Sequence, residues 1–171
     1  MPTERRGQTL CVARFARTKG SDPGFDPDSY AVYRNVFDNL ITRNNKGEIV
    51  PQIATAWKQV SETVVEFQIR TDVLFHDGQK LTAEDVAYSA RRITDPKFGS
   101  PQLGQFDKII KAEVSAPNTV RLTTSGPYPA LLAQLVKLSI VPKAVVEAVG
   151  KDAFNLSIRH VVHFHSSEVL G

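Results

Sequence analysis

The fold is decided by residues 53–93, whose sequence is IATAWKQVSETVVEFQIRTDVLFHDGQKLTAEDVAYSARRI. Apolar and polar residues alternate within this stretch over Thr63–Arg70. A period of two is typical of a strand that is buried on one face and exposed to water on the other. The sequence therefore predicts a half-buried strand, whose apolar face consists of Val65, Phe67 and Ile69.

A turn and a helix follow this strand. Residues Phe75–Gly78 end in Asp-Gly, and glycine adopts the positive φ that a tight turn requires. Thr82 is placed to cap a helix, because its hydroxyl can accept a hydrogen bond from one of the first free N–H groups. Glu84 and Asp85 suit the positive end of the helix dipole, and Asp95-Pro96 is expected to break the helix. The stretch is a strand–turn–helix unit.

Hydrophobic periodicity and turn residues predict further elements on both sides. Strands and helices follow one another without internal repeats, which indicates a mixed α/β fold. Trp57 is expected to be substantially buried against the strand of residues 63–70, because its large apolar surface needs a core. The predicted elements are a first strand over Thr9–Phe15; a helix from Ser29 to Thr42, capped by Asp28 and ended by Asn44–Gly47; a hairpin of Lys111–Ser115 and Thr119–Thr123; a helix starting near Pro127 or Pro129, with Leu131, Leu132, Leu135 and Val136 buried; and a helix from Pro142 to Val149, closed by Gly150.

In amino-acid sequence, residues 53–93 closely resemble the solute-binding proteins of peptide-type ABC importers, which form the extracytoplasmic solute-binding family five. In that family a Trp, a strand rich in β-branched and aromatic residues, an F-x-DG turn and an LTAEDV-like helix start recur in this order. The similarity continues in both directions and covers roughly Thr9–Asn155. The matching segments are Phe25-Asp26-Pro27, Tyr33–Leu40, Ile93–Pro96, Asn118–Leu122 and Val141-Pro142-Lys143.

The resemblance implies an α/β fold that corresponds to the N-terminal part of a two-lobed periplasmic-binding-protein fold, of type II and the peptide-binding cluster. A mixed sheet with flanking helices is expected, and the second lobe is expected to be absent, because proteins of the family are much longer. Residues 1–43 would be the N-terminal part of lobe one, residues 44–155 the smaller subdomain, and residues 156–171 a divergent tail. The family's Gly-rich turn does not follow Phe154-Asn155 here, which a frameshift or premature stop would explain.

The implied function is that of the solute-binding component of an ABC importer, with dipeptides or oligopeptides as the solute. A nickel- or other solute-binding member of the same family is one alternative, and a non-binding truncated remnant from a frameshift or pseudogene is another. The implied partners are a peptide or other small solute and a permease in the membrane. The implied location is the periplasm or the cell envelope.

The resemblance also suggests which residues face the solute. The segment at the start of the first predicted helix is the first candidate, and Tyr30 and Tyr33 offer flat apolar contact with a hydroxyl group. Either tyrosine could instead pack the helix onto the sheet. A second candidate is the loop Ser100–Leu103, which approaches the ligand in relatives. The candidate residues are Ser29, Tyr30, Ala31, Val32, Tyr33, Gln102 and Leu103.

Charge and motif content exclude other classes. The chain has 21 basic and 18 acidic residues, well mixed along its length, with a net charge of +3 and no basic stripe interleaved with aromatics, so nucleic acid is not an expected partner. No apolar run is long enough to span a membrane, and no apolar segment typical of a signal peptide follows the charged N-terminus. The sequence contains no G-x-S-x-G, no P-loop and no G-x-G-x-x-G. We expect a binding protein, not an enzyme, and no cofactor.

Cysteine and histidine give weak signals. The single Cys11 excludes an internal disulfide, and a buried thiol is favoured over a lipoprotein cysteine. On a strand, His163 and His165 would share a face and could hold one zinc or nickel ion, whereas a helix would bring His160 and His163 together. Incidental histidines in an out-of-frame or frayed tail are the favoured interpretation. His76 is expected to be a turn residue and not half of a catalytic dyad.

Overall fold

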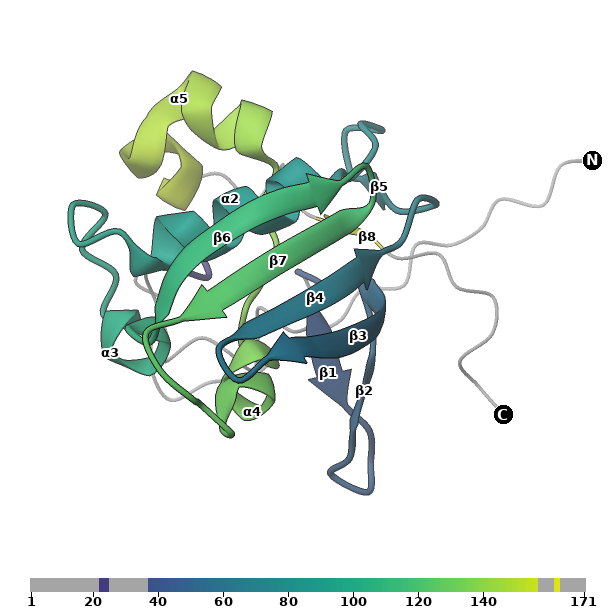
Figure 1. The fold of residues 1–171 in the computed structure, drawn as a ribbon. Helices are drawn as coiled ribbons and strands as arrows, with labels where there is room; N and C mark the ends of the chain where they lie inside the picture. The colour runs from purple at the N-terminus through teal and green to yellow at the C-terminus, as the bar shows by residue number, and fades with distance from the viewer. Residues whose placement is uncertain (1–21, 25–36, 157–161, 164–171) are drawn as a thin grey trace, which may run out of the picture.

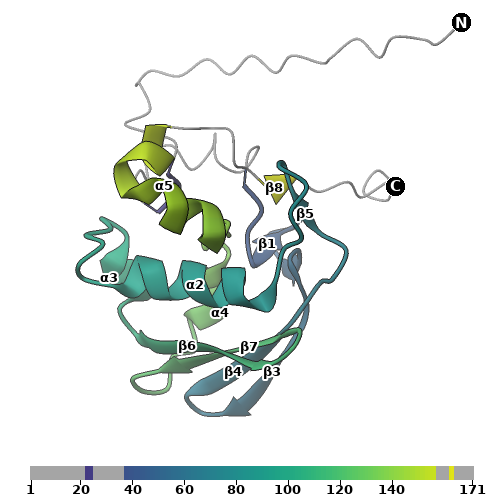
Figure 2. The same ribbon diagram turned by 90° about the horizontal axis from the view of Figure 1, so that it is seen from above.

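The chain is arranged in three layers. The computed structural model describes residues 22–24, 37–156 and 162–163. A four-stranded antiparallel sheet forms the first layer, and helix α2 (Ala83–Thr94) lies across one face of it (Figure 1). Helix α5 (Lys143–Leu156) lies on the other side of α2, away from the sheet (Figure 2). The mixed α/β architecture predicted from the sequence is confirmed.

The sheet has the strand order β3-β4-β7-β6, and each neighbouring pair is antiparallel. Two hairpins, β3–β4 and β6–β7, meet where β4 pairs with β7, with Val65 opposite Leu122. The strand predicted over residues 63–70 and the predicted hairpin are confirmed, whereas β3 was not predicted. The strands are β3 (Ala54–Ser61), β4 (Val64–Ile69), β6 (Ile109–Ala116) and β7 (Thr119–Thr124).

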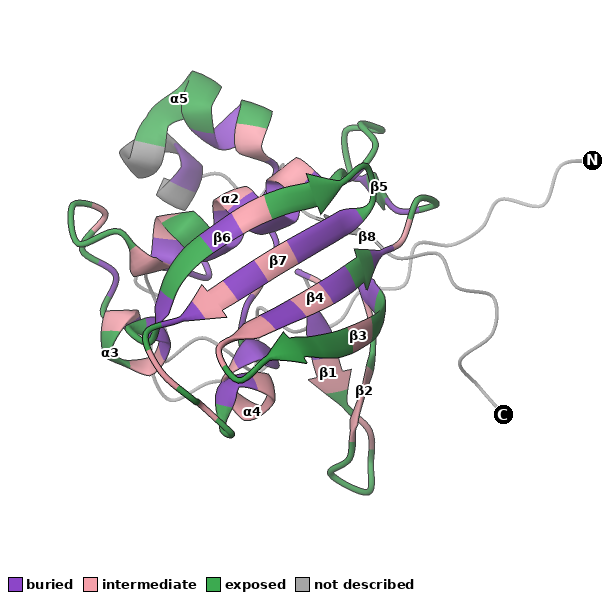
Figure 3. Cartoon of the chain, viewed as in Figure 1, coloured by how far each residue is buried: buried purple, intermediate pink, exposed green. Residues whose placement is uncertain are grey.

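The two faces of the sheet differ in character. Inward-facing residues of β4 and β7, among them Val65, Phe67 and Leu122, are buried in one core with the apolar side of α2. Figure 3 shows the resulting alternation of buried and partly exposed residues along β7. On the opposite face, Glu66 and Arg121 form a salt bridge across β4 and β7 with an N–O distance of 2.6 Å. The alternating pattern read from the sequence therefore separates a core face from a charged outer face.

Helix α2 begins with the predicted cap. The Asp85 N–H donates to the Thr82 hydroxyl at 3.3 Å, and the Thr82 N–H donates to the Asp85 carboxylate at 2.9 Å. This reciprocal pair is a capping box, which provides acceptors for two N–H groups at the helix start. The helix ends at Thr94, directly before Asp95-Pro96, as predicted.

Replacing Thr82 with alanine should lower the free energy of unfolding by about 1 kcal/mol, because the Asp85 N–H loses its side-chain acceptor and the Asp85 carboxylate loses the hydrogen bond from the Thr82 hydroxyl. Urea denaturation measures the effect. The matched control is Thr71→Ala at an exposed position, which should change stability by less than about 0.5 kcal/mol. Equal stabilities of the two variants would show that the cap contributes little.

The helix predicted from Ser29 to Thr42 is wrong over residues 37–42. Ile41–Arg43 is strand β1, which pairs antiparallel with β2 (Ile49–Pro51). Asn44–Gly47, expected to end the helix, forms the turn between these strands, and Gly47 has a φ of +82°.

The error has a physical reason. Phe37, Leu40 and Ile41 are all buried, as their helical spacing suggested. The extended chain buries them equally well, because it has neighbours on both sides: Leu40 N–H donates to Leu138 C=O, and Ala54 N–H donates to Leu40 C=O. Pairing with distant segments overrides the local pattern.

The remaining elements are short. Strand β5 (Leu74–Phe75) pairs with β8 (Val162–His163), and α3 is Leu103–Phe106. Helix α4 (Leu131–Leu135) lies where a helix was predicted, and Gly150 interrupts α5 with a φ of +77°. Among the described residues, no helix combines the length and the apolar character that crossing a membrane requires.

Trp57 is half-buried rather than substantially buried. It lies opposite Phe67, with ring centroids 6.5 Å apart. Its strand, β3, is at the edge of the sheet, so neighbouring side chains cover the indole from one side only. The predicted contact with the alternating strand is correct, but the predicted depth of burial is not.

Candidate functional site

Residues 22–24 are held against α2 and the loop that follows it. We call this arrangement the N-terminal anchor; it consists of Asp22-Pro23-Gly24 with Arg92, Ser100 and Gln102. The Arg92 guanidinium donates to both oxygens of the Asp22 carboxylate, at 3.0 Å from Nη1 to Oδ1 and through Nη2 to Oδ2. The Gln102 amide donates to Pro23 C=O at 2.6 Å, and the Ser100 hydroxyl donates to Gly24 C=O at 2.5 Å. Side chains of α2 and of the loop after it thus contact three consecutive residues of the N-terminal segment.

Arg92 is enclosed in this anchor. The Asp22 side chain is 0% exposed and that of Arg92 is 8% exposed. The guanidinium carbon lies 4.0 Å from the centre of the Phe98 ring and 5.6 Å from that of Phe154. Both distances lie within the range of cation–π attraction. The charge therefore has a carboxylate and two aromatic rings around it in place of water.

The chain is fixed a second time at Asn39, which is 2% exposed. The Asn39 side-chain amide donates to Val136 C=O at 2.9 Å, and its carbonyl oxygen accepts from the Ser139 hydroxyl at 2.8 Å. The Asn39 backbone N–H donates to the Gln52 side chain at 3.1 Å. These contacts hold residues 38–40 between two other segments of the chain.

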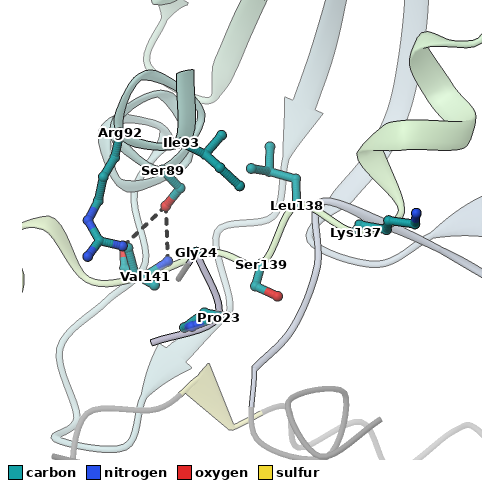
Figure 4. A pocket seen from close by; sticks show the side chains of 9 residues that line it. All are labelled: Pro23, Gly24, Ser89, Arg92, Ile93, Lys137, Leu138, Ser139 and Val141. Carbon is teal, nitrogen blue, oxygen red and sulfur yellow. Dashed lines mark hydrogen bonds between the residues drawn. The ribbon is translucent and has the colours of Figure 1, made fainter. Parts of the chain in front are cut away.

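A small cavity lies between these two sets of contacts (Figure 4). Pro23 and Gly24 line it from the N-terminal anchor, and Ser139 lines it from the segment that binds Asn39. Its volume is about 10 Å³, which is no more than the space needed for one water molecule. Figure 4 also shows the Ser89 hydroxyl, which accepts from the Val141 N–H at 3.0 Å at the rim. The cavity cannot accommodate a solute.

A larger, open groove of about 610 Å³ lies between α2 and α5. Two of its cationic residues, Arg91 and Lys143, donate to the Glu84 carboxylate at 2.6 and 3.0 Å. Burial raises the pKa of Glu84, but the hydrogen bonds from Lys143 and Arg91 outweigh this effect, so its pKa lies below its usual value. These two cations therefore neutralise a carboxylate of the protein itself.

Of the predicted ligand-facing residues, the structure describes two. Gln102 is buried in the N-terminal anchor with its amide directed at Pro23 C=O, and Leu103 begins α3 and is partly exposed. Contact of either with a solute stays a prediction. The other candidates lie outside the described residues; they are Ser29, Tyr30, Ala31, Val32 and Tyr33.

Most residues named in the predictions for the tail and the N-terminus lie outside the described residues. Within the described parts of the chain, no group of three His, Cys, Asp or Glu residues could hold a metal ion. His163 is described only as part of β8, and His160 and His165 lie outside the described residues, as do Cys11 and the strand predicted over Thr9–Phe15.

Sequence reasoning missed the residues that make up the two sets of contacts. Asp22-Pro23-Gly24 has the composition of an ordinary turn, and Arg92 that of a basic residue suited to a helix end. The two charges are 70 positions apart, and no local pattern links them. The helical spacing of residues 29–42 predicts a helix at Asn39 and gives no indication that its side chain links distant segments.

Comparison with known proteins identifies the family. The family described as bacterial extracellular solute-binding proteins, family 5 middle region, matches residues 48–162. The chain is 30% identical over 139 residues to the periplasmic oligopeptide-binding protein OppA of Escherichia coli (strain K12), which covers 70% of this chain and 26% of that protein. It is 43% identical over 70 residues to the periplasmic murein peptide-binding protein MppA of the same organism, covering 41% of this chain and 13% of that protein.

Comparison with solved structures supports the same fold. NikZ from Campylobacter jejuni, in complex with Ni(L-His), superposes with a TM-score of 0.73 at 30% identity, covering 83% of this chain and 28% of that one. OppA of Haemophilus influenzae, in complex with RPPGFSPFR, superposes with a TM-score of 0.75 at 22% identity, covering 85% of this chain and 33% of that one, and supports the fold alone.

The chain spans about a quarter of the length of relatives such as OppA of Escherichia coli. Within that span, its α/β fold is that of the periplasmic binding proteins, as the resemblance of residues 53–93 implied. The chain belongs to the bacterial extracellular solute-binding proteins of family 5.

Proposed function

We propose that this chain supplies part of the solute-binding component of an ABC importer whose solute is a peptide. One observation carries the proposal: the described subdomain matches peptide-binding relatives in both sequence and fold. The role is binding and not catalysis. The implied partner is a permease in the membrane, and the implied location is the periplasm or the cell envelope, where relatives such as OppA and MppA are named as residing.

In the proposed function, three consecutive stretches of the chain have different roles. Residues 1–43 belong to lobe one, residues 44–155 form the smaller subdomain, and residues 156–171 are a divergent tail. Ser29–Tyr33 (Ser29, Tyr30, Ala31, Val32 and Tyr33) contact the solute. The loop Ser100–Leu103 is a second and smaller contact, in which Leu103 offers an apolar side chain and Gln102 holds the loop to Pro23.

The proposed mechanism is closure of two lobes about the solute. Closure removes water from the peptide, so that hydrogen bonds to its backbone become strong and selective. The closed form then docks on the permease. The smaller subdomain is attached to lobe one and moves with it.

A chimera tests the proposal. Residues 22–156 of this chain replace the aligned residues of Escherichia coli OppA, and trialanine is titrated by calorimetry. We expect saturable binding with an affinity within about tenfold of OppA itself, because both the ligand-facing segment and the subdomain are supplied in register. The matched control is a chimera that takes only residues 48–156, which keeps OppA's own ligand-facing segment.

The two chimeras separate the alternatives. If the control chimera binds trialanine, and the 22–156 chimera is folded but does not bind it, the peptide assignment is wrong. In that case the alternatives are a remnant without binding activity or a different solute. Titration of the 22–156 chimera with Ni(L-His) examines the second of these, which the fold shared with NikZ favours.

A further inference from the structure

Among the described residues, two Arg–Asp pairs of similar geometry lie in opposite surroundings. In both, the guanidinium donates to the two carboxylate oxygens of its partner. Arg70 and Asp72 are neighbours at the surface, with side chains 27% and 64% exposed. Arg92 and Asp22 are 8% and 0% exposed and come from distant parts of the sequence. Ion pairs at the surface contribute little, whereas a buried charge that loses its partner is strongly destabilising.

The contacts within the N-terminal anchor involve more than a charge. Arg92 donates to both oxygens of the Asp22 carboxylate, and Gln102 and Ser100 each donate to one of the next two backbone carbonyl groups. The position of Gly24 is selective as well, because a Cβ there would lie 3.3 Å from Arg92 Nη1 and 3.3 Å from a Phe98 ring carbon. The anchor therefore favours an Asp at position 22 and a small residue at position 24, whereas the contacts to the Pro23 and Gly24 carbonyl groups are ones that any residue could make.

We infer that the N-terminal anchor is an intramolecular carboxylate-recognition site, which holds residues 22–24 to the smaller subdomain. Arg92 is its specificity-determining residue. In the division proposed above, Asp22 belongs to lobe one and Arg92 to the smaller subdomain, so the pair links the two. That last step rests on the proposed function; the recognition of the carboxylate does not.

A site of this kind can be emptied and refilled. Asp22→Ala removes the carboxylate and leaves the Arg92 guanidinium facing a space that formate can occupy. The experiment measures thermal unfolding of the full chain by circular dichroism, in sodium formate and in sodium chloride at equal ionic strength. The matched control is Asp72→Ala, which removes a carboxylate from the exposed pair.

In chloride, Asp22→Ala should lower Tm by about 10 °C and Asp72→Ala by no more than about 2 °C. Formate should restore about half of the loss in Asp22→Ala, with a saturable dependence on its concentration. It should have no such effect on Asp72→Ala or on the double variant Asp22→Ala/Arg92→Met. The inference would be overturned if formate still raised the Tm of the variant that lacks Arg92. It would also be overturned if Asp22→Ala had the same Tm in formate and in chloride.

Asp22→Asn provides a second test that leaves no space for formate. It retains the shape of the side chain and removes its charge. We expect a lower Tm than that of the parent chain and no response to formate. An Asp22→Asn chain as stable as the parent would also refute the site. None of these measurements uses a peptide solute, so their failure is distinguishable from failure of the chimera.

Discussion

Phe67→Ala is expected to lower the free energy of unfolding by about 3–5 kcal/mol, the range for emptying an aromatic core position. Phe67 is 0% exposed in the inward face of β4, where it lies between Trp57 on β3 and Val120 on β7. No neighbouring backbone can move into the space, because the strands on both sides are fixed by the sheet. Urea denaturation followed by circular dichroism measures the loss.

Trp57→Ala is the informative comparison. Tryptophan is the larger side chain, but Trp57 is only half-buried, so its removal should cost about 1–2 kcal/mol. The order of the two effects therefore follows burial and not size. A Trp57→Ala chain that is destabilised as much as Phe67→Ala would show that the indole belongs to the core after all.

The second large effect concerns solute binding. The 171-residue chain alone should bind trialanine about a thousandfold more weakly than the 22–156 chimera, in the millimolar range if the chimera binds in the micromolar range. The chain spans about a quarter of the length of relatives such as OppA. Charge-assisted hydrogen bonds contribute about 1.5–3 kcal/mol each, so contacts from the rest of such a protein account for a difference of this size. Parallel calorimetric titrations provide the test, and micromolar binding by the chain alone would contradict the expectation.

The local features of the fold were predictable because their causes are local. The strand of residues 63–70 follows from alternation alone, and the start of α2 follows from Thr82 and Asp85, which satisfy each other within one turn. The hairpin β6–β7 follows from its turn residues in the same way. Prediction was wrong at Ile41 and Thr42, where the burial pattern suits a helix and a strand equally, and only the pairing with β2 decides between them.

The contacts that hold the N-terminal anchor could not be predicted for a related reason. A single aspartate and a single arginine carry no information about which partner each will meet 70 positions away. The resemblance alone suggests that Gln102 lies near the solute. Its amide lies against Pro23 C=O, a contact that depends on the packing of three separate segments. Such contacts are decided by the tertiary fold, which a single sequence does not reveal.

The bridge between Asn39 and Ser139 has a consequence for the history of the fold. It brings together two points that are 100 positions apart, and every strand of the four-stranded sheet lies between them. The chain thus goes into this unit and comes out of it at adjacent places. Units with neighbouring ends can be inserted, exchanged or lost without displacing the polypeptide around them. A unit with this geometry can be inserted into a binding protein, or modified within it, while the rest of the structure is retained.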